Sequence, residues 1–241
     1  MRRFYASTES FNNAGVTLAE DETRHLRDVL RLREGAVVRV FDGEGREFEA
    51  SVSKIEKRSA NLEILRAIEP AAPESGLELK VAAGILKGEK FDFVIQKAVE
   101  LGVSEFVPLQ THRCDVKLKD GTKRLDRWRK IALEAAKQCG RARLMEIKEP
   151  DEFAAFLNEF DRTQTAGMMF TERNGSGFPP DLRYKKITAL IGPEGGWEDS
   201  EISDAEASGF SLVTLGGRVL RAETAVISIT AILQHRFGDL N

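Results

Sequence analysis

The fold is decided by two glycine-bearing runs near the C-terminus, Leu190-Ile-Gly-Pro-Glu-Gly-Gly-Trp197 and Leu215-Gly-Gly-Arg-Val-Leu-Arg-Ala-Glu-Thr-Ala225. Each follows a short aliphatic stretch, 187–191 or 210–215, that predicts a buried strand, and each leads into a helical pattern. Glycine permits backbone dihedrals and close approaches that a side chain would prevent. Because ligands of open α/β sheets bind beyond the carboxyl ends of the strands, the two runs predict a ligand crevice at this edge.

The first run excludes the common nucleotide-binding loops. It lacks the lysine and the serine or threonine of a P-loop, and it lacks the G-x-G-x-x-G spacing of a dinucleotide fold. The charge of Glu194 would repel a phosphate group. A carboxylate in the loop favours a cofactor that carries positive charge.

The paired motifs Ile191-Gly-Pro-Glu-Gly-Gly196 and Leu220-Arg-Ala-Glu-Thr-Ala225 resemble those of the RsmE family, bacterial uridine-N3 methyltransferases of small-subunit ribosomal RNA. Further matches are Gln96-Lys-Ala-Val-Glu-Leu-Gly102 and Glu134-Ala-Ala-Lys-Gln-Cys-Gly-Arg141, so the resemblance covers nearly the whole chain. It implies an α/β protein of the SPOUT class, whose C-terminal parallel sheet contains a trefoil knot and binds S-adenosyl-L-methionine. It also implies a small N-terminal PUA-like β-barrel that binds RNA.

The chain divides into two predicted domains. In residues 1–70, hydrophobic alternation over 35–68 predicts a strand meander, and 21–32 predicts one helix, which together indicate a small barrel. Residues 71–76 are the predicted linker, since proline and glycine there interrupt helix and strand. From 77 to 241, strands alternate with helices, as expected for a parallel sheet.

Charge gives a mixed indication of an RNA ligand. The net charge is −3, so bulk charge does not indicate nucleic-acid binding. Residues 111–148, however, hold 12 Lys and Arg against five Asp and Glu. Such a stretch can bind a phosphodiester backbone, contact a partner subunit, or form an ordinary solvated helix face. The predicted last helix, 223–237, carries an apolar stripe that indicates either a subunit interface or a helix central to its own domain.

Candidate catalytic residues follow the second run. Arg221 offers several directed donors just before a helix N-terminus, where it could stabilise negative charge on a uracil; the alternative is a salt bridge to Glu223 or Glu194. The base that removes the N3 proton could be Glu223, Glu194 or solvent. Arg221 and Glu223 are the predicted catalytic pair, and Thr224 is either a helix cap or a cofactor contact.

The resemblance assigns the remaining site residues. The predicted cofactor-binding residues are Met169, Phe170, Glu172, Ile191, Gly192, Pro193, Glu194, Gly195, Gly196, Leu215, Gly216, Leu220 and Thr224. The predicted RNA-binding residues are Arg2, Arg3, Arg31, Lys87, Gln138 and Arg141.

The remaining expectations concern metals, partners and location. No cysteine or histidine spacing suggests a metal site, and no run is long enough to span a membrane. The resemblance implies a cytoplasmic homodimer that acts on small-subunit (16S) ribosomal RNA. Two alternatives stay open, a non-catalytic RNA-binding or ribosome assembly factor and a SPOUT methyltransferase with another RNA target.

Overall fold

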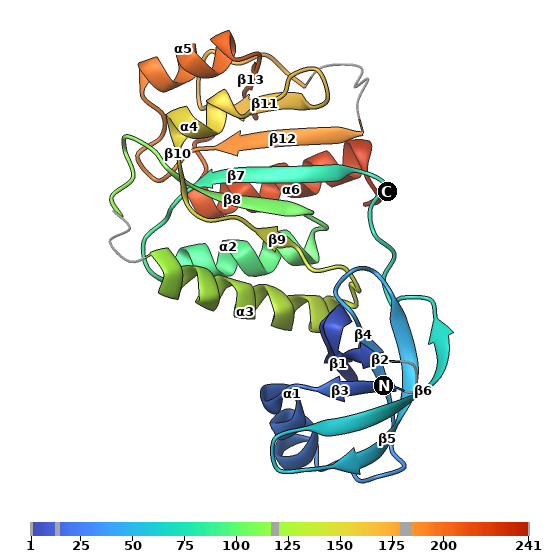
Figure 1. Cartoon of the computed structure of the whole chain (residues 1–241). Coiled ribbons are helices and arrows are strands. Elements are labelled where there is room, and N and C mark those ends of the chain that lie inside the picture. The colour runs from blue at the N-terminus through green and yellow to red at the C-terminus, as the bar shows by residue number, and fades with distance from the viewer. Residues whose placement is uncertain (1, 13–14, 117–120, 179–184, 241) are drawn as a thin grey trace. The chain divides into compact units, whose positions relative to one another are not determined.

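The computed structural model describes residues 2–12, 15–116, 121–178 and 185–240. The chain forms two compact units (Figure 1), one of Met1–Glu74 with Ala136–Leu144 and one of Ser75–Ala135 with Met145–Asn241. The short segment Ala136–Leu144 therefore belongs with the N-terminal part of the chain. The domain limits at 70 and 77 stay predictions.

The first unit is built on a curled sheet whose six described strands follow the order β1-β4-β5-β6-β3-β2. Its strands are β1 (Arg3–Tyr5), β2 (Phe11–Asn12), β3 (Gly15–Leu18), β4 (Val37–Phe41), β5 (Glu47–Ile55) and β6 (Ala60–Ile68). A short 3-10 helix, η1 (Thr8–Ser10), precedes β2. Alternate strand residues point inward and form one hydrophobic core, which includes Phe4, Leu18, Val38, Val40 and Leu62. The β-rich N-terminal fold predicted from hydrophobic alternation is present.

The predicted single helix over 21–32 is wrong in its second half. Helix α1 covers Glu20–Arg24 and continues as a π-helix, η2 (His25–Val29). The amide of Leu30 donates to the carbonyl of His25 over 2.9 Å, and Arg31 then takes a left-handed φ of 51° that ends the helix. Leu26, one of the apolar residues whose spacing predicted the helix, is fully buried in the core. The segment therefore packs as predicted, although its second half is a π-helix and not an α-helix.

The second unit contains a sheet whose described strands pair in parallel throughout, in the order β10-β8-β7-β12-β11-β13, with β9 beside β8. Its strands are β7 (Glu78–Gly84), β8 (Glu105–Gln110), β9 (Glu146–Ile147), β10 (Asp151–Glu152), β11 (Ala166–Phe170), β12 (Lys186–Ile191) and β13 (Ser211–Val213). Its helices are α2 (Glu89–Glu100), α4 (Phe153–Asn158), α5 (Asp199–Ala207), α6 (Ala222–Phe237) and most of α3 (Gly121–Cys139), whose residues from Ala136 onward belong to the first unit.

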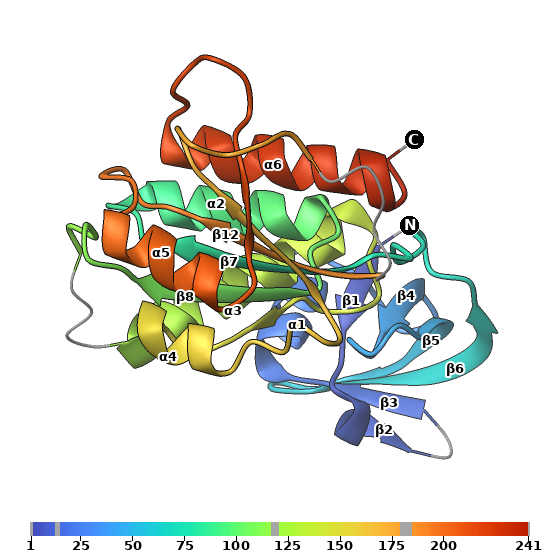
Figure 2. The same ribbon diagram turned by 90° about the horizontal axis from the view of Figure 1, so that it is seen from above.

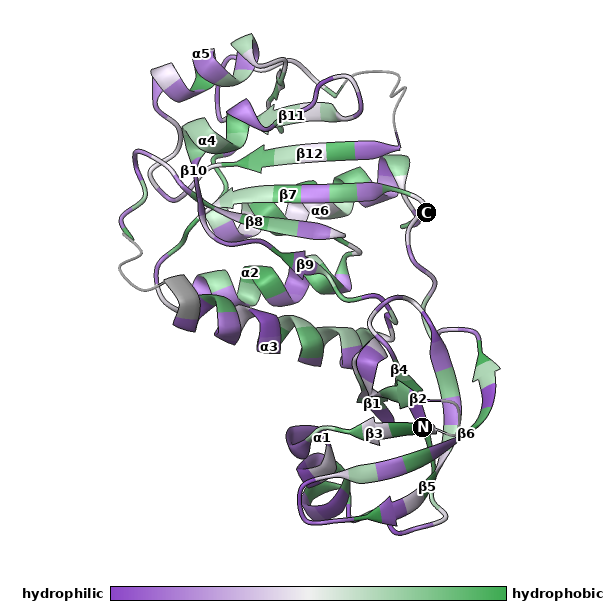
Figure 3. Cartoon of the chain, viewed as in Figure 1, coloured by the Kyte–Doolittle hydropathy of each residue, from purple (hydrophilic) through white to green (hydrophobic). Residues whose placement is uncertain are grey.

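Helices cover both faces of this sheet (Figure 2). Helices α2 and α6 lie on one face, and α4 and α5 lie on the other. The central strands are therefore largely apolar, as Figure 3 shows for most of β12, and Ile187–Ile191 is buried at every position. This is the parallel α/β sheet predicted from the sequence, whereas the trefoil knot stays a prediction.

The apolar stripe of α6 packs largely within its own unit. Val226, Ile229 and Leu233 are buried at no more than 3% exposure. Helix α2 likewise buries a stripe at helical spacing, and Gly102 follows its end with a φ of 74°, as predicted for a helix stop. The stripe on α6 thus has a function inside the chain, and the subunit interface stays a prediction.

Candidate active site

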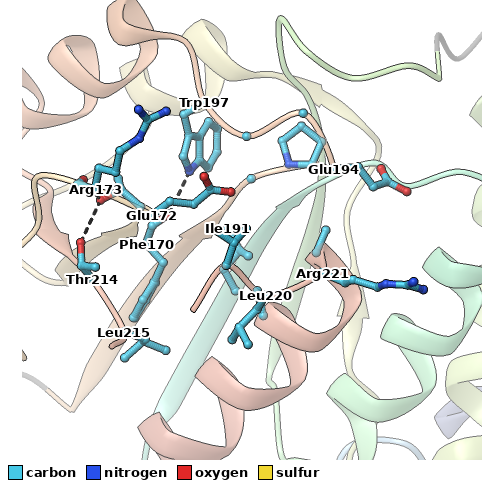
Figure 4. Close-up of a pocket in the computed structure, with 18 of the residues that line it drawn as sticks. Phe170, Glu172, Arg173, Ile191, Glu194, Trp197, Thr214, Leu215, Leu220 and Arg221 are labelled. Carbon is cyan, nitrogen blue, oxygen red and sulfur yellow. Dashed lines mark hydrogen bonds between the residues drawn. The ribbon is translucent and has the colours of Figure 1, made fainter. Parts of the chain in front are cut away.

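Three loops meet at the carboxyl ends of the neighbouring strands β12, β11 and β13 and enclose a pocket of about 880 Å³ (Figure 4). The first glycine loop, 192–197, follows β12. The second glycine loop, 214–221, follows β13 and leads directly into α6. Residues 171–174, after β11, form the third wall. Parallel strands bring these distant segments to one edge, which is where the sequence predicted a crevice.

Most of the predicted cofactor-binding residues line this pocket. They are Phe170, Glu172, Ile191, Gly192, Pro193, Glu194, Gly195, Gly196, Leu215, Gly216 and Leu220. Met169 instead lies fully buried in the core between the sheet and α4, since successive residues of a strand face opposite sides. Thr224 is exposed in the first turn of α6 and is not a lining residue; the N-cap of α6 is Arg221, so the capping alternative for Thr224 is wrong.

Glycine is required at two positions for different reasons. Gly196 has a φ of 70°, and a Cβ placed on it would meet no atom within 4 Å, so a side chain there would enter open pocket space. Gly84, the last residue of β7, lies directly against Pro193. A Cβ on Gly84 would lie 2.6 Å from the backbone nitrogen of Pro193. The first glycine loop can therefore rest on β7 only while residue 84 has no side chain.

Side-chain hydrogen bonds connect the loops to one another. The indole Nε1 of buried Trp197 donates to the carbonyl of Phe170 over 3.0 Å, which joins the first glycine loop to β11. The amide of Gly175 donates to Oγ1 of Thr214 over 3.0 Å, which joins the loop after β11 to the second glycine loop. These two hydrogen bonds join the walls of the pocket.

Arg113, which follows β8, also lines the pocket and contacts the first glycine loop. Its Nη1 donates to the carbonyl of Gly195 over 3.2 Å, and its Nε donates to Glu198 over 2.8 Å. That hydrogen bond lowers the pKa of Glu198 below its usual value. Glu198 in turn caps α5 in a capping box with Glu201.

The charged side of the pocket contains one lysine between two carboxylates. Nζ of Lys90 donates to Glu194 over 3.2 Å and lies 3.8 Å from Oε2 of Glu223. This oxygen of Glu223 is buried without a hydrogen-bond partner. Arg221 is exposed and has no ion pair among the described residues. The salt-bridge alternative for Arg221 is therefore wrong, because both carboxylates considered for it are paired with Lys90.

Several pocket residues were not assigned from the sequence, namely Lys90, Arg113, Trp197 and Thr214. Trp197 ends the first run and could have been found from that position. Lys90 and Arg113 carry no local signal, since each is a charged residue in a polar segment. Only the strand order places them at the pocket.

The predicted RNA-binding residues are distributed over both units. Four are exposed: Arg2, Arg31, Lys87 and Gln138. The side chain of Arg3 is 8% exposed, and its Nε donates to Glu47 over 2.9 Å. That of Arg141 is 5% exposed, and its Nη2 donates to Glu74 over 2.8 Å. Both buried guanidinium groups thus have protein partners within the first unit, and a role for them in RNA binding stays a prediction.

Groups of metal ligands and membrane-spanning helices are both absent from the described part of the chain. No group of three or more His, Cys, Asp or Glu side chains is placed to hold a metal ion there. None of the described helices has the length and apolar character needed to cross a membrane.

Fold and site together define an RNA methyltransferase. Residues 73–234 match the model of the RNA methyltransferase domain, and residues 18–65 match that of the RNA methyltransferase PUA domain. The chain belongs to the ribosomal RNA small subunit methyltransferase E family, which confirms the resemblance stated from the motifs. The relative of that name from Synechocystis is 34% identical over 243 residues, covering 96% of this chain and 78% of the relative. That from Aquifex aeolicus is 30% identical over 98% of this chain and 100% of its own length.

Solved structures agree with this assignment. The small subunit methyltransferase E from Neisseria gonorrhoeae, crystallised bound to S-adenosyl methionine, superimposes with a TM-score of 0.90 at 33% identity and covers 100% of both chains. A protein from Legionella pneumophila, crystallised with the bound cofactor, gives a TM-score of 0.89 at 32% identity over 99% of this chain and 98% of its own.

Proposed function

We propose that this protein is an S-adenosyl-L-methionine-dependent methyltransferase that acts on N3 of a uridine in small-subunit (16S) ribosomal RNA. The observation that carries the proposal is the pocket itself, in which both glycine loops and the end of β11 surround one space at the edge of a parallel sheet. The cofactor bound by the Neisseria relative and the names of the curated relatives support it.

The residues of the pocket fit this cofactor. A volume of about 880 Å³ is sufficient for a molecule of its size. Phe170, Ile191 and Leu220 provide apolar walls for a flat base, and the open side of Gly196 leaves room beside the backbone. The carboxylate of Glu172 favours a ligand with positive charge, such as a sulfonium or an amine. We assign cofactor binding to the predicted residues that line the pocket, and not to Met169 or Thr224.

In the proposed reaction the N3–C bond forms as the S–CH₃ bond breaks, and the N3 proton leaves to a base. When bound, the cofactor supplies the electrophilic methyl group. Arg221 donates hydrogen bonds to a uracil oxygen and stabilises the negative charge that develops there. Glu223 is the proposed base, because it follows the lining residue Ala222 and its buried Oε2 accepts no hydrogen bond, although Nζ of Lys90 lies 3.8 Å away as an ion-pair partner.

RNA binding is assigned to exposed positive charge. The exposure of Arg2 and Arg31 in the first unit and of Lys87 in the second supports their proposed contacts with phosphates, and the exposed amide of Gln138 could bind a base or a sugar. The basic stretch 111–148 is a further candidate for contact with RNA or with a partner subunit. We propose a cytoplasmic homodimer, as the resemblance to the family implies.

The test is methyl transfer from labelled cofactor to small ribosomal subunits of a strain that lacks this protein, followed by identification of the methylated nucleoside. We expect 3-methyluridine in 16S RNA. Label in another nucleoside or another RNA would indicate a methyltransferase with a different target. RNA binding without any transfer would indicate an assembly factor, which the enclosed cofactor-sized pocket argues against.

A further inference from the structure

Lys90 holds a position that its own helix does not favour. It is the second residue of α2, and the first turn of that helix also carries Glu89 and Asp92. Acidic residues are stabilised at a helix N-terminus, whereas a cation is disfavoured there by the helix dipole. Stability of α2 therefore does not account for Lys90, and its contacts outside the helix do.

Those contacts join two segments of the pocket. Glu194 belongs to the first glycine loop and Glu223 to the first turn of α6, and Nζ of Lys90 lies 3.2 Å from a carboxylate oxygen of one and 3.8 Å from that of the other. The side chain of Glu223 is only 17% exposed. Without a shared cation, two partly desolvated carboxylates would face each other across a short distance, which is unfavourable.

Arg221 is a second cation that lines the pocket, as does Glu194. It lies two residues before Glu223, and its side chain and that of Glu194 extend to the same side of the pocket (Figure 4). Because Lys90 already neutralises Glu194 and Glu223, the guanidinium of Arg221 is left without an ion pair among the described residues. A guanidinium bound to a carboxylate could not donate fully to a uracil oxygen.

We propose that Lys90 is a positioning residue, which occupies Glu194 and Glu223 so that Arg221 stays available to the substrate. The inference rests on the proposed methyl transfer and adds to it a residue that acts through Arg221. Replacement of Lys90 leaves the carboxylates free to bind Arg221. Substrate and cofactor would still bind, while the transition state would lose its donor.

The experiment compares Lys90→Met with Lys97→Met in methyl transfer to small-subunit RNA. Lys97 is a matched control, because it lies on the same helix and forms its own ion pair with Glu100 over 2.8 Å. We expect Lys90→Met to lower kcat by roughly tenfold to a hundredfold, the size expected for a displaced catalytic group, with cofactor Kd and RNA KM little changed. Lys97→Met should retain wild-type kcat, and Lys90→Arg should recover most of the activity.

A double-mutant cycle with Arg221→Ala tests whether the loss of kcat in Lys90→Met depends on Arg221. If Lys90 acts through Arg221, Lys90→Met should lower kcat only slightly in a protein that already carries Arg221→Ala. An equal loss in both backgrounds would overturn the inference, as would a Lys90→Met enzyme that matches Lys97→Met. Lys90→Gln provides the same comparison if the methionine variant does not fold. A wild-type protein that transfers no methyl group would instead refute the proposed function, so the two failures are distinguishable.

Discussion

Replacement of Gly196 by valine tests the pocket most directly. Gly196 closes the turn of the first glycine loop, where its amide donates to the carbonyl of Pro193 over 3.0 Å, and its φ is 70°. A Cβ at this position would point into open pocket space. Valine therefore introduces two changes, a backbone conformation that a β-branched residue avoids and side-chain atoms inside the pocket.

The energy cost of the left-handed backbone conformation alone gives the smallest expected change in cofactor affinity. A left-handed conformation costs a residue with a Cβ roughly 1–2 kcal/mol, so the loop of the variant would relax from its present shape unless binding restored it. Since about 1.4 kcal/mol is a tenfold change in affinity, cofactor Kd should rise by roughly fivefold to thirtyfold. The methyl groups of valine in the pocket would add to that loss.

The assay is isothermal titration of S-adenosyl-L-methionine into the purified variant, with thermal unfolding as a check on folding. Gly177→Val is the control outside the pocket, because Gly177 has open space and no left-handed φ. Gly217→Ala is the control within the pocket wall, because a Cβ there also meets no atom within 4 Å while its φ is unstrained. An unchanged Kd for folded Gly196→Val would refute the assignment of this pocket to the cofactor.

Three further predictions follow from particular contacts. Arg221→Ala should keep the cofactor Kd but lower kcat by about 10²–10³, and full activity in steady-state assays would refute its role as donor. Trp197→Phe removes the donor to the carbonyl of Phe170, so urea unfolding should show a loss of about 1–3 kcal/mol; an unchanged midpoint would contradict a structural role for this bond. Burial raises the pKa of Asp42, but hydrogen bonds led by that from Arg46 outweigh it and hold the pKa below 3.8. A carboxyl group whose pKa is lower in the folded than in the unfolded state stabilises the fold above its unfolded pKa, and this stabilisation is lost as the pH falls through its folded pKa. Asp42→Asn removes the group, so the free energy of unfolding, measured with urea, should fall less below about pH 4 than in the wild type.

The second unit could be predicted from the sequence because its strands are buried on both faces. Runs such as Ile187–Ile191 are apolar at nearly every position, and glycine stops and helical stripes separate them. In the first unit, the π-helix His25–Val29 was not predicted, because its apolar spacing is close to that of an α-helix over so short a segment. The two forms differ in hydrogen bonding, which hydrophobic periodicity does not report.

Charged side chains were the hardest to assign, because a sequence does not show which partner a charge meets. Arg3 and Arg141 were predicted to bind RNA, and both have carboxylate partners inside the first unit. The partner of Arg3, Glu47, is 44 residues away, and that of Arg141, Glu74, is 67 residues away. The sequence alone does not distinguish these two buried residues from exposed ones such as Arg2 and Arg31.

The same distance in sequence explains why Lys90 and Arg113 were not placed at the pocket. Strand order puts β7 directly beside β12, and β8 beside β7. Residues that follow β7 and β8 therefore emerge at the same edge as the first glycine loop, although Lys90 and Glu194 are 104 residues apart. In a parallel sheet every strand contributes the segment after its carboxyl end to one shared edge. The loops after β11, β12 and β13 form the pocket walls, and the segments after β7 and β8 supply two cations that form ion pairs in or just after the first glycine loop, Lys90 with Glu194 and Arg113 with Glu198.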